Sequence, residues 1–317
     1  MTLRSGGQIL VDQLKIHGAR HVFCVPGESY LAVLDALHDA DIETVVCRQE
    51  GGAAYMAEAV GKLSGRPGIA MVTRGPGATN ASPGIHIASQ DSTPMILFVG
   101  QVARDMKERE AFQELDYKAV FGSMAKWVVE IDRAERIPEI ISRAYHVAMQ
   151  GRPGPVVIAL PEDMLTDRVA VADAMRAEPV LVRPAAQDMQ ELQRRLLASS
   201  RPIVLAGGSG WTAEGSGDLQ RFAESFRLPV AVTFRRQMLF PADHPNFAGD
   251  LGIGPNPKLL KRIQESDLVL LVGGRLSEMP SQSYTLLDIP GNGAKLVHVH
   301  PGTEELNRVY RAGLGIA

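Results

Sequence analysis

Residues 68–80 read GIAMVTRGPGATN, a short apolar run followed by a turn that contains two glycines and a proline. A continuous apolar run of this length is typical of a strand that is buried on both faces of a parallel sheet. Glycine permits the tight turn, and we expect a helix to begin at Gly77, at the end of the strand. The stretch therefore predicts one strand–turn–helix unit of an α/β fold.

The same pattern recurs along the 317 residues. Short apolar runs that end in glycine or proline predict strands, and most segments between them have helical spacing. The predicted strands of the first half are His21–Gly27, Ile42–Cys47, Gly68–Thr73, Met95–Gly100, Lys126–Ile131 and Pro155–Pro161. Those of the second half are Pro202–Gly208, Leu228–Phe234, Phe247–Gly252, Leu268–Gly274, Lys295–Pro301 and Leu314–Ala317. The predicted helices include Ser5–Gly18, Tyr30–Ala40, Gly51–Ser64, Ile137–Gln150, Asp188–Ala198, Gly217–Phe226 and Asn256–Glu265.

A change of composition separates the two halves. Residues 166–186 are polar, rich in Ala and Arg, and contain Pro179 and Pro184, which is typical of a linker. We therefore expect an α/β protein with two successive doubly wound domains, residues 1–165 and 187–317, each with a mostly parallel six-stranded sheet. Because the chain stops on its last predicted strand without a polar tail, we also expect a truncated or processed form.

The composition excludes several classes of protein. Hydrophobic residues make up 45% and charged residues 22%, which is ordinary for a globular protein and not for a disordered one. The net charge of −3 offers no basic surface for nucleic acid or anionic lipid, and no apolar run is long enough to span a membrane. Only Cys24 and Cys47 are present and the eight His are scattered, so we expect no disulfide framework, no metal site and a cytoplasmic location.

Candidate ligand-binding residues follow the strands of the first domain. In open α/β sheets ligands bind at the carboxyl ends of the strands, which here read Val25–Ser29, Arg48–Gly52 and Thr73–Asn80. Glu50 would lie at a helix N-terminus among small residues, where a poorly solvated carboxylate can transfer protons. The alternative is that Glu50 is simply an acidic residue of a first helical turn, where it favours the helix dipole.

The second domain contains a glycine loop of its own. Gly207, Gly208 and Gly210 follow a predicted strand, and the spacing Gly208-x-Gly210-x-x-Ala213 matches the fingerprint of dinucleotide sites. The acidic residue expected after the next strand is absent, and Arg235 and Arg236 stand there instead, where they could meet a 2′-phosphate. A glycine turn that packs a helix on a strand explains the same pattern, so both interpretations stay open.

Taken together, these strand ends resemble the thiamine-diphosphate enzymes of the acetohydroxyacid (acetolactate) synthase and pyruvate oxidase type. The resemblance covers nearly the whole chain, and its blocks occur in the family's order. The matching blocks are Val22–Gly27 (VFCVPG), Arg48–Glu58 (RQEGGAAYMAE), Thr73–Asn80 (TRGPGATN), Asp91–Pro94 (DSTP), Gly100–Val102 (GQV), Phe112–Glu114 (FQE) and Gly151–Val156 (GRPGPV).

The resemblance implies a function and a site. The cofactors would be thiamine diphosphate and Mg²⁺, the substrate a 2-oxo acid, and the reaction that of an acetolactate-synthase-like lyase or carboligase. Residues 1–165 would be the pyrimidine-binding domain and 187–317 the central domain, in a homodimer or homotetramer whose active site lies between subunits. Glu50 would be the catalytic glutamate that activates the cofactor, and its cleft would be lined by Pro26, Gly27, Thr73, Pro76, Gly77, Asn80 and Gln113. The alternatives are a decarboxylase or acyl-CoA lyase with an ADP-type central site, or a non-catalytic module of the same fold.

Four departures from the family pattern affect these expectations. Arg74 replaces a small serine, and Glu28 stands where acetohydroxyacid synthases carry glycine, so we expect a reshaped substrate pocket. The stretches 272–278 and 249–254 differ from the FAD-contacting motifs of those synthases, which argues against FAD. The family's Gly-Asp-Gly motif with a downstream Asn, which holds Mg²⁺ and the diphosphate, is not found, so we expect the third domain to be absent from this chain.

Overall fold

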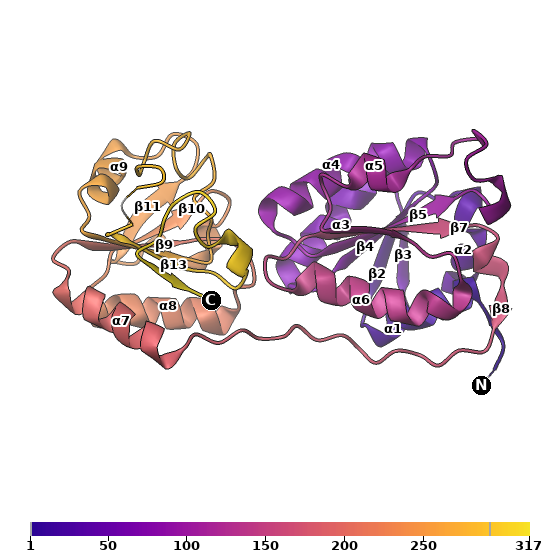
Figure 1. Ribbon diagram of the computed structural model, residues 1–317, viewed down its shortest axis with the longest axis horizontal. Helices are drawn as coiled ribbons and strands as arrows, with labels where there is room; N and C mark the ends of the chain where they lie inside the picture. The colour runs from indigo at the N-terminus through magenta and orange to yellow at the C-terminus, as the bar shows by residue number, and fades with distance from the viewer. Residues whose placement is uncertain (1, 292) are drawn as a thin grey trace. The chain divides into compact units, whose positions relative to one another are not determined.

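The computed structural model describes residues 2–291 and 293–317 and divides into two compact units, one up to Val180 and one from Leu181 to Ala317 (Figure 1). Each unit contains one parallel sheet of six strands with helices on both faces. The predicted fold class is therefore confirmed.

The sheet of the first unit has the strand order β3-β2-β4-β5-β7-β6. Its strands are β2 (His21–Cys24), β3 (Glu43–Val46), β4 (Gly68–Val72), β5 (Met95–Gln101), β6 (Trp127–Glu130) and β7 (Pro155–Pro161). Helices α1 (Gly6–Ile16), α2 (Leu31–His38) and α6 (Ile137–Met149) cover one face (Figure 1). Helices α3 (Glu50–Ser64), α4 (Pro76–Asp91) and α5 (Tyr117–Phe121) cover the other. Two separate apolar layers result, because successive residues of each strand point to opposite faces.

Helices α3 and α4 pack against each other and the sheet with almost no side chain between them. A Cβ added to Gly84 of α4 would collide with the Cβ of Ala54 of α3, and one added to Gly68 of β4 would collide with the carbonyl oxygen of Ala57. Only glycine fits at such contacts, because its Cα carries no side chain. This close packing holds the N-termini of α3 and α4 beside each other at the carboxyl end of the sheet.

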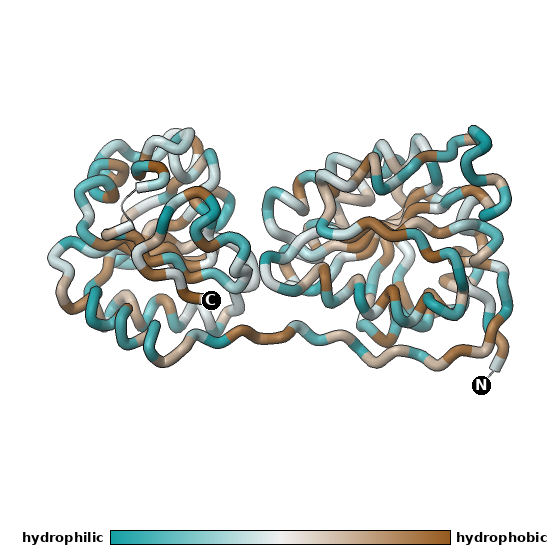
Figure 2. Tube along the Cα trace, viewed as in Figure 1, coloured by the Kyte–Doolittle hydropathy of each residue, from teal (hydrophilic) through white to brown (hydrophobic). Residues whose placement is uncertain are grey.

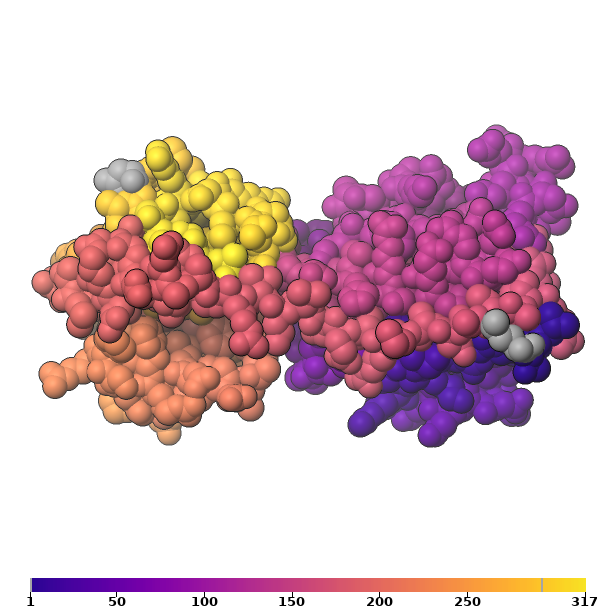
Figure 3. Space-filling view, turned by 60° about the horizontal axis from the view of Figure 1, so that its bottom comes forward, coloured from indigo at the N-terminus to yellow at the C-terminus, as the bar shows by residue number. Residues whose placement is uncertain are grey.

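The segment after β7 lies along the surface of the first unit (Figure 3). Its first residues form β8 (Arg168–Val169), which pairs antiparallel with β1 (Arg4–Ser5). Ala177 is buried in the core layer of α1, α2 and α6, and the guanidinium of Arg66 donates to its carbonyl oxygen at 3.1 Å. Of the predicted linker 166–186, the part up to Glu178 therefore contacts the first unit.

The sheet of the second unit has the order β11-β10-β9-β12-β13-β14. Its strands are β9 (Pro202–Ala206), β10 (Val230–Thr233), β11 (Phe247–Leu251), β12 (Leu268–Val272), β13 (Leu296–Val299) and β14 (Leu314–Ile316). Helices α7 (Ala186–Ala198) and α8 (Ala213–Phe226) cover one face, and α9 (Pro257–Gln264) covers the other together with Leu276, Leu286, Leu287 and Tyr310. Figure 2 shows the hydrophobic residues of each unit gathered along the strands.

Helix α8 starts four residues earlier than the sequence pattern predicts. Helix α8 begins at Ala213 rather than Gly217, because the side chain of Thr212 accepts a hydrogen bond from the backbone N–H of Gly215 and caps the helix. The pairing of β1 with β8 was not expected, because each strand has only two residues and no alternating pattern marks it.

We expect Gly84→Ala to lower the free energy of unfolding of the first unit by about 1–3 kcal/mol, because the new methyl group overpacks the α3–α4 contact. Urea unfolding followed by circular dichroism measures this. Gly52→Ala is the matched control: nothing lies within 4 Å of its added Cβ, so alanine should stabilise α3 by up to about 1 kcal/mol. A Gly84→Ala protein as stable as wild type would show that the close packing is not required.

Candidate active site

The ends of β2 and β4 touch each other at the carboxyl edge of the first sheet. A Cβ on Gly27 would lie 2.5 Å from the Cβ of Thr73, so the two loops approach as closely as glycine allows. The hydroxyl oxygen of Thr73 lies 2.8 Å from that of Ser29, which ties the loops together by a hydrogen bond. A Cβ on Gly77 would in turn lie 2.8 Å from the Cγ2 of Thr73. Three of the predicted site residues, Gly27, Thr73 and Gly77, therefore meet.

Glu50 lies beside this contact as the first residue of α3. The cap of the helix is Gln49, whose side-chain oxygen accepts from the N–H of Gly52 at 3.0 Å, so Glu50 is free of a capping role. Its Oε2 accepts from the side-chain N–H of Asn80 at 3.0 Å. A Cβ on Gly77 would lie 3.5 Å from its Oε1, and no donor to Oε1 is present among the described residues. The half-buried carboxylate thus has one oxygen fixed and one oxygen available beside a glycine.

The three remaining predicted residues border the same place. Pro26 precedes Gly27 and Pro76 is the first residue of α4, and both are exposed. A Cβ on Gly75 would lie 2.8 Å from the Cβ of Gln113, which brings Gln113 to the turn before α4. Gly75 has a φ of +56°, so this turn requires glycine for its backbone as well as for its space.

Two residues that hold these loops were missed by the sequence reasoning. The hydroxyl of Tyr117 accepts from the N–H of Gly75 at 3.1 Å and lies 3.3 Å from the carbonyl oxygen of Gly100. Burial raises the pKa of Tyr117 to about 12, so its hydroxyl keeps the proton that it donates. Glu162, which pairs with Arg74 at 2.9 Å, directly follows β7. The strand-end rule could have found Glu162, whereas no local pattern marks Tyr117.

The glycine loop of the second unit is used for packing. Gly208 has a φ of +74°, and a Cβ on it would collide with the carbonyl oxygen of Gly273 after β12. The indole N–H of Trp211 donates to the carbonyl oxygen of Gly207 at 2.7 Å, and the guanidinium of Arg236 donates to the carbonyl oxygen of Gly208. From the sequence, Arg236 could have met a 2′-phosphate. In the structure it is buried and holds the loop at Gly208 and Ser209 by hydrogen bonds. Only at Gly210 is there open space around an added Cβ, so nucleotide binding by Gly207, Gly208 and Gly210 stays a prediction.

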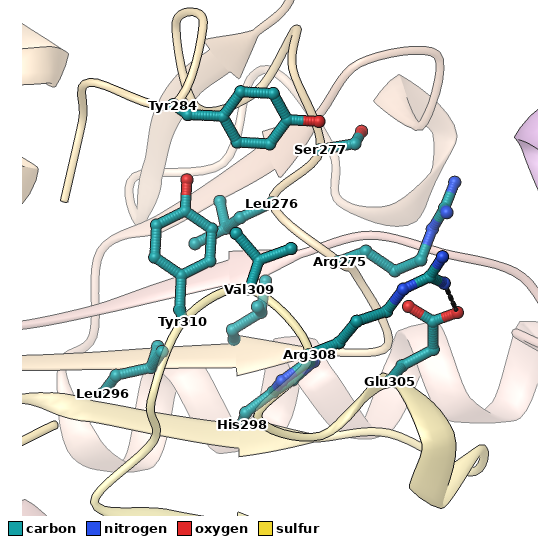
Figure 4. A pocket seen from close by; sticks show the side chains of 11 residues that line it. Arg275, Leu276, Ser277, Tyr284, Leu296, His298, Glu305, Arg308, Val309 and Tyr310 are labelled. Atoms are coloured by element: carbon teal, nitrogen blue, oxygen red, sulfur yellow. Dashed lines mark hydrogen bonds and ion pairs between the residues drawn. The ribbon is translucent and has the colours of Figure 1, made fainter. Parts of the chain in front are cut away.

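A cavity of about 140 Å³ lies at the ends of β12 and β13 (Figure 4). Its apolar wall is formed by Leu271, Leu276, Leu296 and Val309, and its polar wall by Arg275, Ser277, Tyr284, His298, Glu305, Arg308 and Tyr310. The ion pair between Arg308 and Glu305 spans 2.9 Å. Sites for drug-sized ligands occupy ~300–1,000 Å³, so this cavity is smaller than such sites.

Neither a cluster of metal ligands nor a helix suited to cross a membrane is found among the described residues. In the ranges 2–291 and 293–317, no three His, Cys, Asp or Glu side chains are grouped so that they could hold a metal ion. None of the helices in those ranges is long and apolar enough to cross a membrane. Cys24 and Cys47 are both buried as free thiols, in the core layers on opposite faces of the first sheet, and burial raises the pKa of the Cys24 thiol to about 11.

Comparison with protein families assigns both units. Residues 4–120 match the model described as "Thiamine pyrophosphate enzyme, N-terminal TPP binding domain". Residues 189–317 match the model described as "Thiamine pyrophosphate enzyme, central domain".

Individual relatives carry related names. The chain is 31% identical to the "Probable acetolactate synthase large subunit" of Methanocaldococcus jannaschii, over 98% of this chain and 53% of the relative. It is 32% identical to the "Acetolactate synthase large subunit" of Haemophilus influenzae, over 93% and 52%. It is 33% identical to the "Acetolactate synthase isozyme 3 large subunit" of Escherichia coli, over 88% and 50%. The chain thus spans about half the length of the curated relatives it matches.

The pH dependence of stability in the second unit should depend on His298. Its Nε2 bonds the carbonyl oxygen of Gly274 at 2.8 Å, and burial lowers the pKa of His298 to about 4 from its usual 6.5. Between pH 6.5 and pH 4 the unfolded chain binds a proton at His298 and the folded chain does not. The free energy of unfolding is therefore highest above pH 6.5 and falls toward pH 4, by about 3 kcal/mol for this group. We expect His298→Asn to flatten this slope in urea titrations at pH 7, 6 and 5. If the free energy of unfolding depended on pH equally in the wild type and in His298→Asn, His298 would not be the group responsible.

Proposed function

Since the chain belongs to the thiamine pyrophosphate enzyme family, we propose that it forms the pyrimidine-binding and central domains of an enzyme that cleaves and joins 2-oxo acids in the manner of acetolactate synthase. The observation that carries the proposal is the placement of Glu50. Its carboxylate lies at the carboxyl edge of the sheet with Oε2 held by Asn80 and Oε1 available beside Gly77.

The residues present fit the pyrimidine ring of the cofactor. A ring nitrogen that carries a proton needs an acceptor, and Oε1 of Glu50 has no other donor among the described residues. The missing side chain of Gly77 lets Thr73 and Oε1 of Glu50 come close to its Cα, at 2.8 Å and 3.5 Å from an added Cβ, so the acceptor lies beside bare backbone. When bound, thiamine diphosphate supplies the electron sink that cleavage next to the carbonyl group of a 2-oxo acid requires.

Each residue of the site has a part in this proposal. Oε1 of Glu50 would accept the hydrogen bond of a protonated ring nitrogen, and the N-terminus of α3 favours the negative charge of the carboxylate. Asn80 orients the carboxylate by its hydrogen bond to Oε2. Pro26, Gly27, Thr73, Pro76 and Gln113 form the walls that position the ring and exclude water.

The diphosphate is bound largely through Mg²⁺, which needs oxygen ligands, and the described residues do not group such ligands together. Neither a Gly-Asp-Gly motif in the sequence nor a cluster of three carboxylate, His or Cys side chains in the described residues offers them. We therefore propose that the diphosphate site lies on a further domain of the full-length protein, contributed by a second subunit, so that the active site lies between the subunits of a homo-oligomer. We also place the enzyme in the cytoplasm, where its two free cysteines stay reduced.

We expect Glu50→Gln in the full-length protein to lower the turnover rate by roughly 10²–10⁴, the usual effect of losing a positioned proton-transfer group. Cofactor affinity should change little, because charge-assisted contacts to the diphosphate dominate binding. Exchange of the thiazolium C2 proton with deuterium, followed by NMR, measures the step directly, and calorimetry measures the affinity.

Glu43→Gln is the matched control. Glu43 is an exposed carboxylate at the amino end of β3, and Glu50 follows the carboxyl end of the same strand. Unimpaired proton exchange in Glu50→Gln, or an equal loss in Glu43→Gln, would refute the proposed role of Glu50.

A further inference from the structure

Arg74 links the ends of three strands of the first sheet. It lies in the loop after β4, and its guanidinium pairs with Glu162, directly after β7, and with Glu28, in the loop after β2. The Nη1–Oε2 distance to Glu162 is 2.9 Å, and the Nη2–Oε1 distance to Glu28 is 3.4 Å. Two of the residues at which the sequence departs from the synthase pattern, Arg74 and Glu28, thus form one ion pair. We call Glu28, Arg74 and Glu162 the charge triplet.

The three members differ in their access to solvent. The side chain of Arg74 is 10% exposed, that of Glu162 34% and that of Glu28 65%. A guanidinium that is buried to this degree requires anionic partners, and both of its terminal nitrogens have one. Its buried Nε has no hydrogen-bond partner among the described residues. Arg74 is thus tied to the protein through these two ion pairs, and Glu28 is the member most accessible to a ligand.

The charge triplet borders the proposed active site. Glu28 follows Gly27, which contacts Thr73, and the N–H of Arg74 donates to the hydroxyl of Ser29 at 3.4 Å. The same hydroxyl bonds Thr73. Two carboxylates and one guanidinium carry a formal charge of −1, and the exposed part of that charge is on Glu28. A substrate that enters at these strand ends would meet this negative charge.

We propose that Glu28, held in place by Arg74, determines substrate charge: it rejects 2-oxo acids with a second carboxylate and admits those with a neutral side chain. This inference rests on the function proposed above. Like charges brought close together repel each other, so a carboxylate at the entrance disfavours a ligand that carries a second carboxylate. Glu28 is a specificity-determining residue and Arg74 a positioning residue.

The test compares two five-carbon substrates, 2-oxopentanoate and 2-oxoglutarate, on the full-length protein with its cofactor. We expect kcat/KM of the wild type to favour 2-oxopentanoate, and Glu28→Gln to reduce the preference about tenfold or more, the scale of one partly screened like charge. Arg74→Lys keeps the positive charge but cannot pair with both carboxylates at once. Its preference for 2-oxopentanoate should therefore lie between those of the wild type and Glu28→Gln. Glu43→Gln is the control. The Glu43 side chain is 69% exposed and lies at the opposite edge of the sheet, so its substitution should leave the preference unchanged.

A second readout does not depend on turnover. Arg74→Ser should lower the thermal unfolding midpoint, because it leaves Glu28 and Glu162 without their partner, and adding Glu28→Gln should restore part of the loss. Strictly additive shifts would overturn the coupling of Glu28 to Arg74. An unchanged preference in an active Glu28→Gln protein would overturn this inference alone, whereas a wild-type protein that uses neither substrate and binds no cofactor would overturn the proposed function with it.

Discussion

The candidate site depends on the contact between α3 and α4. Gly84 and Ala54 touch without intervening side chains, and Gly68 lets α3 lie directly on β4. Because both helices begin at the same edge of the sheet, this contact places the first turn of α3 within hydrogen-bond distance of the second turn of α4. The hydrogen bond from Asn80 to Glu50 spans the two helices at this end. Larger residues at the contact would separate the helices and open the cleft in which the carboxylate lies.

Two carboxylates at this edge are held in different ways, which suits two different tasks. Glu50 is oriented by a neutral amide and keeps one oxygen available, as a group that exchanges a proton must. Glu28 is paired with a guanidinium that is itself anchored to Glu162, so its charge is fixed. The proposed chemistry and the proposed selection by charge thus depend on neighbouring loops that Ser29 and Thr73 connect.

The sequence predicted the parts of this structure that follow from local pattern. Apolar runs gave the strands of both sheets, and the strand-end rule led to Glu50 and to the loop that contains Thr73 and Gly77. Local sequence pattern could not predict contacts between segments that are distant in the chain. One example is the hydrogen bond that the N–H of Gly75 donates to the hydroxyl of Tyr117. For the second glycine loop, sequence left packing and nucleotide binding equally open, and only the contact of Gly208 with Gly273 shows why glycine is needed there.

The central claim is that Glu50 receives the pyrimidine ring of the cofactor, and a crystal structure of the full-length protein with thiamine diphosphate and Mg²⁺ tests it most directly. The account predicts that the ring nitrogen N1′ lies within hydrogen-bond distance of Oε1 of Glu50, with the ring against Gly77 and with Asn80 still bonded to Oε2. A ring held by another acceptor, or a Glu50 carboxylate turned to solvent in the complex, would contradict it.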